Sequence, residues 1–430
     1  MSAGPRILVG WRRTVSRLPF FLRALGYALR RRMYPGFRLW GAVGGLPAVL
    51  RLEAELGLTK TILVDGRAYS SPSLPGYPSR AFDAAVARGG LDFASAGTSR
   101  NRHIGQVILG ISRECAYRCA HCYEHRNLQG GSAVPLERWT EVIGQLQDAG
   151  VGVIVLSGGE PMLRFEGVLE LLRRADKDRS EFHLHTSGDG VTPERARALK
   201  AAGLAVAAVG LDDVDEARFD ALRGAPGAYQ RACSALRSFS EAGLLACTNL
   251  CLTPGFVRSG GLPRYLELVW GLGVGLVQLL EPRPCGGYFG RDPGDLLEES
   301  DRQAVRAFVR EANAAPRWAD HPLLYPLAEV ERSPSIGCTM GGISHFAIDS
   351  AGQVVPCVFA HVSFGSILTE DLAPILARMR EAIPRPIHAG CPSVLLQNRL
   401  ERLAEGGTRT PAYAELASDW HLRLYGGGPG

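Results

Sequence analysis

The chain has 430 residues, which is enough for two or three domains with buried cores. Hydrophobic residues make up 46% of it and charged residues 21%, which excludes a disordered chain, a collagen and a coiled-coil rod. Ten cysteines are too few for a disulfide scaffold, and three of them fall within eight positions, which favours a metal site over crosslinks.

The positive charge is concentrated at the N-terminus. Residues 1–52 contain ten arginines and no acidic residue, so the rest of the chain is net acidic although the formal charge of the whole is +5. This local excess gives no general indication of nucleic-acid binding. The longest early apolar stretch, residues 18–29, is interrupted by Arg23 and is too short to cross a bilayer. A cytoplasmic location is therefore expected.

A helix is predicted over residues 20–33. Pro19 favours a helix start, and Phe21, Leu25 and Leu29 recur at helical spacing, while arginines lie mostly away from them. Two interpretations remain open. The helix lies on an anionic membrane surface, which would give a peripheral membrane contact, or it packs on the body of the protein with its arginines in solvent.

The chain divides into four parts. Residues 1–104 form the basic helical extension, in which 61–64 is a short strand. Residues 105–290 form the core, residues 291–400 a second, cysteine-containing segment, and residues 401–430 a peripheral C-terminal tail.

Short apolar runs alternate with helical stretches in the core. Strands are predicted at 106–111, 152–157, 181–186, 204–211, 245–252 and 275–281. Helices are predicted at 136–149, 165–176, 193–202, 227–242 and 261–271. The alternation predicts an α/β fold with a parallel sheet, and six units are fewer than the eight of a closed barrel. We therefore expect a partial (β/α)6 TIM-like barrel, with its chemistry at the C-terminal ends of the strands.

Beyond the core, a β-rich stretch is predicted over residues 337–367 and a helix over 371–382. Within the β-rich stretch, a strand pair over 344–355 turns at Asp349 to Gly352.

The decisive motif follows the first core strand. Cys115, Cys119 and Cys122 form a C-x3-C-x2-C run, and thiolates are soft ligands for iron–sulfur clusters and zinc. Three thiolates on one loop can hold three corners of a four-iron cluster and leave the fourth iron open. The alternative is a zinc site, which needs a fourth ligand such as His121 or His125.

This run resembles the cluster motif of radical S-adenosylmethionine (SAM) enzymes. The resemblance implies that the open iron binds SAM and that His121, just before the last cysteine, lies near the adenine. Gly158, Gly159 and Glu160, in the sequence SGGEP after the second strand, resemble the stretch of that family that binds the SAM amino group. Glycines permit a close approach of the backbone to a ligand, whereas a plain strand-to-helix turn is the simpler alternative.

Two further positions match the family less specifically. Arg223 is expected to pair with a carboxylate of SAM or substrate, or else to form a surface ion pair with Asp220 or Asp213. Asn249, on the fifth strand, corresponds to a polar position that often reaches SAM, although a buried core asparagine explains it nearly as well.

The C-terminal cysteines carry a second resemblance. Cys338, Gly352, Cys357 and Cys391 resemble the short form of the SPASM/twitch auxiliary-cluster domain, which implies a second four-iron cluster. Three cysteines leave the fourth ligand open, and the alternatives are Cys285, His345, His361, His388 or none. Cys285 is alternatively a hydrogen donor or a plain thiol, and Cys233, Cys247 and Cys251 are expected to be core thiols.

The resemblance implies a function and its partners. The expected cofactors are a [4Fe–4S] cluster, SAM and an auxiliary [4Fe–4S] cluster. The expected activity is reductive cleavage of SAM to a 5′-deoxyadenosyl radical, which abstracts hydrogen from a peptide or small molecule with net oxidation, and the reductant is a flavodoxin or ferredoxin. A cofactor-biosynthesis or rearrangement enzyme without net oxidation is the alternative. A non-catalytic iron–sulfur or zinc protein is an alternative of another class.

Overall fold

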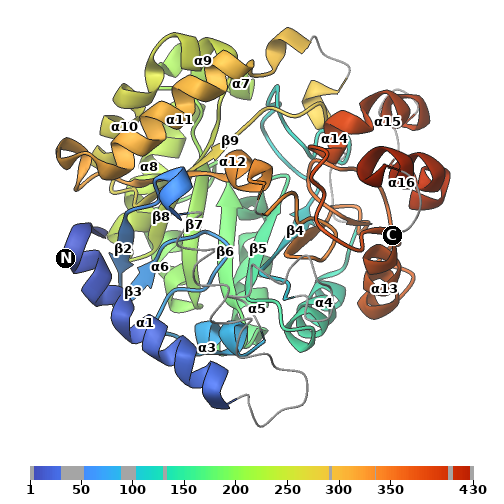
Figure 1. Ribbon diagram of the computed structural model, residues 1–430, viewed down its shortest axis with the longest axis horizontal. Coiled ribbons are helices and arrows are strands. Elements are labelled where there is room, and N and C mark those ends of the chain that lie inside the picture. Colours follow the sequence, from blue (N-terminus) through green and yellow to red (C-terminus); the bar gives the residue numbers. More distant parts are fainter. Residues whose placement is uncertain are drawn as a thin grey trace.

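The computed structural model describes residues 4–30, 53–88, 103–128, 133–289, 293–334, 336–404 and 410–426. Within these residues, six consecutive parallel strands form the centre of one large sheet (Figure 1). They are β4 (Gln106–Ser112), β5 (Val153–Gly158), β6 (Glu181–Thr186), β7 (Leu204–Gly210), β8 (Leu245–Cys251) and β9 (Leu276–Leu280). Each strand is hydrogen-bonded to the next in sequence, which confirms the predicted partial barrel.

Helices alternate with these strands and cover the outer face of the sheet (Figure 1). The helices of this part are α4 (Leu136–Asp148), α5 (Phe165–Arg174), α6 (Pro193–Ala201), α7 (Glu216–Arg223), α8 (Ala228–Glu241), α9 (Pro254–Arg258) and α10 (Gly261–Gly271). The five predicted helices are confirmed to within two residues, and α7 and α9 are short helices that the apolar periodicity did not reveal.

The sheet extends on both sides beyond these six strands. Nine strands pair in the order β10-β9-β8-β7-β6-β5-β4-β11-β12 in the described part of the chain. The added strands are β10 (Leu323–Pro326), β11 (His345–Ile348) and β12 (Val354–Val355). The antiparallel pairing of β11 with β12 confirms the predicted strand pair, but β11 also pairs in parallel with β4. The sheet therefore crosses the expected boundary at residue 290.

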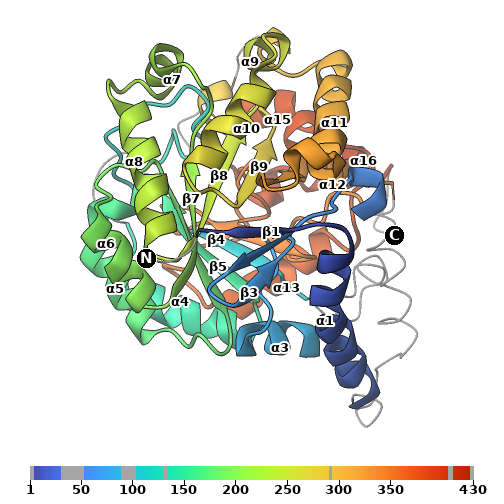
Figure 2. The same ribbon diagram turned by 90° about the vertical axis from the view of Figure 1, so that its left-hand side faces the viewer.

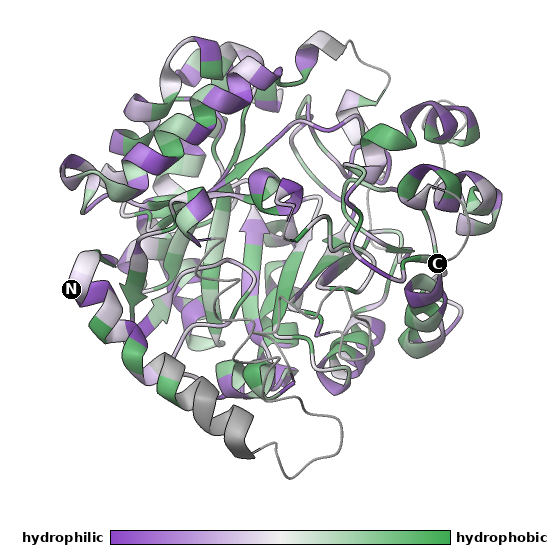
Figure 3. Cartoon of the chain, in the orientation of Figure 1, coloured by the Kyte–Doolittle hydropathy of each residue, from purple (hydrophilic) through white to green (hydrophobic). Residues whose placement is uncertain are grey.

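Side chains on the two faces of the sheet belong to two separate cores. In β7, Ala207 and Val209 pack with the helices, whereas Val206 and Ala208 point to the opposite, concave face. This alternation is the two-residue period of a strand that is buried on both faces. The strands are accordingly mostly apolar, and polar residues are concentrated on the outer helices (Figure 3).

The N-terminal segment covers part of the concave face. Its strands β1 (Arg6–Leu8), β2 (Thr61–Val64) and β3 (Arg67–Tyr69) form a separate antiparallel sheet (Figure 2), and helix α3 (Arg80–Ala87) follows. Ile62 and Tyr69 pack against Leu245, Leu276 and Leu323, which are at or next to the first residues of their strands. The segment predicted as an extension is thus packed at the N-terminal ends of the barrel strands, opposite the edge where chemistry is expected.

Helix α1 begins earlier than predicted. It spans Gly10–Arg30 with Pro19 in its interior, so the prediction that the helix starts after Pro19 is wrong. The turns before Pro19 are held to the body of the protein, because Arg13 and Arg17 each bind Glu53 at 2.7–2.8 Å. The predicted apolar positions Phe21, Leu25 and Leu29 have side chains outside the described part, and residues 31–33 lie outside the described residues altogether.

Most of the remaining helices lie beside the ends of the sheet (Figure 1), whereas Leu327 and Val330 of one helix pack with the core on its concave face. They are α11 (Glu299–Ala314), α12 (Leu327–Arg332), α13 (Leu372–Ala382), α14 (Pro392–Leu395), α15 (Gln397–Leu403) and α16 (Ala417–Tyr425). Residues 410–426 were expected to be peripheral, but Trp420 of α16 is fully buried and packs edge-on against Phe364 and Tyr413. No helix of the described residues combines the length and the hydropathy needed to cross a bilayer.

Candidate active site

The three cysteines of the C-x3-C-x2-C run lie on the loop that follows β4, at the C-terminal edge of the sheet. Neighbouring segments hold this loop by its backbone. Arg118 donates its N–H to the carbonyl of Arg223 at the end of α7 (3.0 Å). Gly287, after β9, donates its N–H to the carbonyl of Cys122 (2.9 Å). The ends of three different strands thus contribute to the position of one loop.

The thiols of this loop lie close enough to interact electrostatically. Burial raises the pKa of Cys115 to about 11 and raises that of Cys122 further. The neighbouring thiols add to the effect, because each disfavours a negative charge on the others. The thiols of Cys115 and Cys122 are therefore costly to ionise, and binding to metal is what lowers this cost in proteins.

Gly158 and Gly159 pack against the strand end that leads into the cysteines. Gly159 donates its N–H to the carbonyl of Ser112 (2.7 Å), and Glu160 donates its N–H to that of Glu114 (2.6 Å). Gly158 has φ +121°, and a Cβ atom there would lie 2.6 Å from the Ser112 oxygen. The glycines are therefore required for backbone approach, whichever ligand the turn binds.

Glu160 is buried, and both oxygens of its carboxylate accept hydrogen bonds from the protein. It accepts hydrogen bonds from the N–H of Met162 (2.9 Å), the hydroxyl of Thr186 (2.7 Å) and both the N–H and the hydroxyl of Ser187 (2.7 and 2.5 Å). Burial raises the pKa of Glu160, and these hydrogen bonds oppose that rise. The side chain links the ends of β5 and β6 and so fixes the glycine turn.

A buried ion pair lies beside Cys119. Arg223 binds Asp212 at 2.5 Å and donates to the Cys119 sulfur at 3.7 Å. Arg223 is only 8% exposed, so the predicted surface ion pair with Asp220 or Asp213 is wrong. Burial by itself lowers the pKa of Arg223, but Asp212 and the Cys119 thiol together raise it above its ordinary value.

Asp212 lies at the end of the fourth predicted strand, but the sequence assigned it no role in the site. It also accepts the N–H of Cys251 (2.9 Å) and lies 3.5 Å from His121 Nε2. Its position directly after a predicted barrel strand was the feature of the sequence that could have identified it as a site residue. Only the fold shows that it connects β7, β8 and the cysteine loop.

Two predicted residues offer polar atoms to a ligand. His121 Nδ1 and the side-chain oxygen of Asn249 are buried and have no hydrogen-bond partner among the described residues. Burial lowers the pKa of His121 to about 4, so the ring is neutral near pH 7. Unpaired buried polar atoms are costly, and a bound polar molecule would satisfy them.

In the described part of the chain, no three His, Cys, Asp or Glu side chains are close enough to share a single metal ion. A four-iron cluster binds each thiolate at a different iron, so its ligands stand farther apart than those of one ion. The site offers three clustered thiols, a guanidinium beside one of them and unpaired polar atoms nearby. These features fit a four-iron cluster with a polar cofactor better than they fit a zinc ion.

The C-terminal cysteines form a second thiol group. The thiol of Cys338 interacts electrostatically with those of Cys357 and Cys391, although these residues are far apart in sequence. The Cys285 thiol is an electrostatic neighbour of Cys391 and Cys357, and also of Cys251. Cys233, Cys247 and Cys251 are buried, as expected of core thiols.

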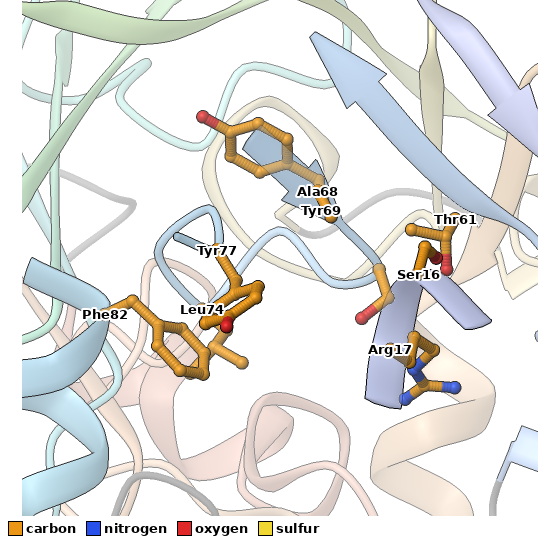
Figure 4. Close-up of a pocket in the computed structure, with 9 residues that line it drawn as sticks. Ser16, Arg17, Thr61, Ala68, Tyr69, Leu74, Tyr77 and Phe82 are labelled. Atoms are coloured by element: carbon orange, nitrogen blue, oxygen red, sulfur yellow. The ribbon is translucent and has the colours of Figure 1, made fainter. Parts of the chain in front are cut away.

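A pocket lies away from both groups, between α1, β3 and the loop before α3 (Figure 4). Tyr77 and Phe82 lie edge to face in its wall, with ring centroids 5.2 Å apart. Tyr69, also in the wall, lies 3.4 Å from Glu181, the first residue of β6. The pocket is therefore near the N-terminal ends of the strands.

Residues 109–259 match the family model of the radical SAM superfamily. The chain carries a radical SAM domain. The matched range contains the cysteine loop, the glycine turn and Asp212, so the family recognised from the sequence is confirmed. The cofactors of that superfamily, a [4Fe–4S] cluster and SAM, are the ones predicted.

Curated relatives point to two kinds of radical SAM enzyme. The chain is 28% identical to the PqqA peptide cyclase of Streptomyces rochei over 258 residues, which cover 59% of this chain and 69% of the relative. It is 26% identical to the pre-heme d1 synthase of Dinoroseobacter shibae over 354 residues, which cover 73% and 84%.

The fold is similar to that of a solved structure, Streptococcus suis SuiB bound to its precursor peptide SuiA. The match has a TM-score of 0.57 at 15% identity and covers 87% of this chain and 89% of SuiB. Because it covers so much of the chain, the likeness in fold extends well beyond residues 109–259.

Proposed function

We propose that this radical SAM enzyme is an oxidoreductase that removes hydrogen from a peptide and transfers an electron to an auxiliary cluster. The observation that supports the proposal is the presence of two thiol groups in one fold. One group lies on the loop after β4, and the other consists of Cys338, Cys357 and Cys391 in the C-terminal segment. A single cluster serves to cleave SAM, and a second gives the electron of an oxidation somewhere to go.

In this proposal Cys115, Cys119 and Cys122 hold the first cluster, which together with SAM supplies one-electron cleavage to an organic radical. The chain's own residues orient the cofactor. His121 and Asn249 offer their unpaired polar atoms, and the backbone of Gly158 and Gly159 lines the approach.

Glu160 and Arg223 act as positioning residues. Glu160 fixes the glycine turn, because its carboxylate binds the ends of both β5 and β6. Arg223 holds a positive charge against the Cys119 sulfur. A cation beside a thiolate favours its ionised, metal-binding form.

The C-terminal segment holds the auxiliary cluster through Cys338, Cys357 and Cys391. The pairing of β11 with β4 attaches this segment to the first strand of the barrel. The loop after β9 binds the carbonyl of Cys122 through Gly287, and Cys285 of this loop is an electrostatic neighbour of Cys391.

A peptide substrate is supported by the relatives, since one is named a PqqA peptide cyclase and SuiB was solved with a precursor peptide. The longer alignment, with a pre-heme d1 synthase, favours a second candidate: modification of a cofactor precursor without net oxidation.

Anaerobic, reconstituted full-length protein separates these functions. It is incubated with SAM, a flavodoxin or ferredoxin as reductant, and either short peptides encoded beside its gene or a tetrapyrrole. We expect 5′-deoxyadenosine in step with a peptide product that has lost two hydrogens. A product of unchanged mass, or turnover of the tetrapyrrole alone, would favour the second candidate. Bound iron without SAM cleavage would identify a non-catalytic iron–sulfur protein.

We also propose that α1 binds an anionic membrane surface. Trp11, Val15, Leu18 and Leu22 are 72, 58, 55 and 59% exposed, and their spacing places them on one face of the helix. The proposal keeps the membrane contact of the first interpretation but changes the face that makes it, because these apolar side chains face solvent while Arg13 and Arg17 face Glu53. An exposed apolar stripe with a tryptophan, in a segment without acidic residues, is typical of helices at the membrane interface.

Vesicle flotation tests the membrane contact. The double variant Trp11→Ser, Leu18→Ser should bind vesicles rich in phosphatidylserine at least tenfold less than the unmodified protein, while Leu422→Ser, an equally exposed apolar residue on α16, should not change binding. Binding to neutral vesicles equal to that on anionic ones would contradict the proposal. So would self-association of the protein that the double variant abolishes, since α1 would then face a second copy.

A further inference from the structure

Two buried polar side chains lie just after Cys122, at the end of the cysteine loop. Glu124 is 2% exposed and Asn127 is 9% exposed, and neither belongs to a motif that the sequence revealed. A charged side chain is almost never fully buried unless it is paired. The partners of Glu124 therefore show what this end of the loop is attached to.

Both side chains bind the turn between β11 and β12, in the C-terminal segment. Glu124 accepts hydrogen bonds from the hydroxyl of Ser350 (2.7 Å) and from the side-chain amide of Asn127 (2.9 Å). The same amide also donates to the carboxylate of Asp349 (3.2 Å). Ser350 and Asp349 are 2 and 4% exposed, so the whole contact is buried, and a partner lost from it would leave a buried polar group unsatisfied.

The turn is itself fixed, and it packs directly on β4. The carboxylate of Asp349 accepts the N–H groups of Ala351 and Gln353 (3.0 and 2.8 Å), which closes the turn on its own side chain. A Cβ atom on Gly110 of β4 would lie 2.5 Å from the backbone nitrogen of Ser350. Only a glycine in β4 leaves room for this approach. The turn is therefore a firm support for the side chains that bind it.

The end of the cysteine loop is also connected to its beginning. Arg113 Nε donates to the carbonyl of Asn127 (3.0 Å), and Asn127 donates its N–H to the carbonyl of Glu124 (2.8 Å). The barrel holds the middle of the loop through the backbone of Arg118 and Cys122. The C-terminal segment holds its end, so a displacement of that end would be transmitted to both sides of the cysteines.

We propose that Glu124 is a positioning residue for SAM cleavage: through it, the docked C-terminal segment fixes the cysteine loop. The proposal rests on the first cluster proposed above. A misplacement of about 1 Å in a group that holds a reactant can lower a rate by about a hundredfold. SAM cleavage should therefore depend on the C-terminal segment without any contact between that segment and SAM. This dependence would restrict radical formation to protein in which the C-terminal segment is docked.

The test compares two serine variants of the full-length protein. Ser350→Ala removes the hydroxyl that binds Glu124, whereas Ser363→Ala removes a hydroxyl that donates to Gln353 (2.6 Å) within the C-terminal segment. After anaerobic reconstitution, 5′-deoxyadenosine formation with dithionite should fall about tenfold in Ser350→Ala and stay unchanged in Ser363→Ala. The iron content should be the same in both variants, because no cysteine is changed.

Variants of Glu124 show whether the two side chains act through one contact. Glu124→Gln keeps an oxygen that can accept the Ser350 hydroxyl and should retain most of the SAM cleavage. Glu124→Leu should lose as much as Ser350→Ala does. Combining these two changes should cause no further loss, since both remove the same contact.

Electron paramagnetic resonance separates positioning from a general loss of stability. Adding SAM should change the spectrum of the reduced cluster in the unmodified protein and in Ser363→Ala, and should change it less in Ser350→Ala. A rate and a SAM-dependent spectrum of Ser350→Ala equal to those of the unmodified protein would overturn the proposal, and so would an equal loss in Ser363→Ala. An unmodified protein that binds iron but never cleaves SAM would instead refute the first cluster, so the two failures are distinguishable.

Discussion

The two thiol groups of this protein are built in opposite ways. Cys115, Cys119 and Cys122 occupy eight residues of one loop, whereas the second group gathers Cys338, Cys357 and Cys391 from three separate segments. The first group needs only a correctly positioned loop. The second exists only when β11 pairs with β4 and the chain returns through Ile387. The first site is therefore part of the barrel itself, whereas the second forms only when the C-terminal segment docks on the barrel.

The largest effect is expected at the three cysteines of the loop after β4. Replacing any one of Cys115, Cys119 or Cys122 with alanine should abolish SAM cleavage, because each thiolate holds a corner of the cluster. The measurement is 5′-deoxyadenosine formed with dithionite as reductant, and Cys247→Ala is the control. Retained SAM cleavage in the triple variant would show that the first site lies elsewhere.

Changes to the C-terminal cysteines should separate SAM cleavage from substrate turnover, whereas the change to the first cysteine group removes both activities. Changing Cys338, Cys357 and Cys391 to alanine should halve the iron, from about eight per chain to about four, and leave part of the SAM cleavage. Turnover of substrate should fall at least tenfold more than SAM cleavage does. About four irons in the unmodified protein, unchanged by the triple substitution, would show that these cysteines bind no cluster.

The buried ion pair of Arg223 and Asp212 should contribute more to the stability of the protein than an exposed ion pair does. Arg223→Gln leaves the Asp212 carboxylate buried without its partner, which should cost about 3–5 kcal/mol in the free energy of unfolding. Arg218→Gln removes a half-exposed partner of Asp213 and should lower the free energy of unfolding far less, because exposed ion pairs are screened by solvent. Urea unfolding of both variants makes the comparison. Similar losses in the free energy of unfolding of the two variants would show that burial does not increase the contribution of the Arg223–Asp212 pair.

The smallest effect is expected where the loop after β9 packs on the loop that carries Cys115, Cys119 and Cys122. Gly286 has φ +54°, and a Cβ atom there would collide with the carbonyl oxygen of Cys122. Gly286→Ala should therefore destabilise the protein by about 1–2 kcal/mol. Gly144→Ala, on α4 with no atom near the new methyl group, should stabilise it by about 0.5–1 kcal/mol. A neutral Gly286→Ala variant in thermal unfolding would show that the two loops can separate freely.

Prediction from sequence succeeded where the signal was local. The six barrel strands, their helices and the strand pair at Asp349 follow from apolar periodicity and turn residues, which act over a few positions. The cysteine loop and the glycine turn are likewise short motifs. The start of α1 was misjudged because ion pairs with Glu53 hold the turns before Pro19, and those pairs form across 36 to 40 residues.

The βα alternation, the radical SAM motif and the spacing of the C-terminal cysteines could be read from the amino-acid sequence, because each depends on residues within a short stretch of chain. The tertiary structure was needed to show that Arg223 pairs with Asp212 and that the N-terminal sheet covers part of the concave face. These contacts join residues that are distant in the chain and adjacent only after the sheet has formed. No local pattern encodes which distant segments will meet, since that choice depends on the packing of the whole fold.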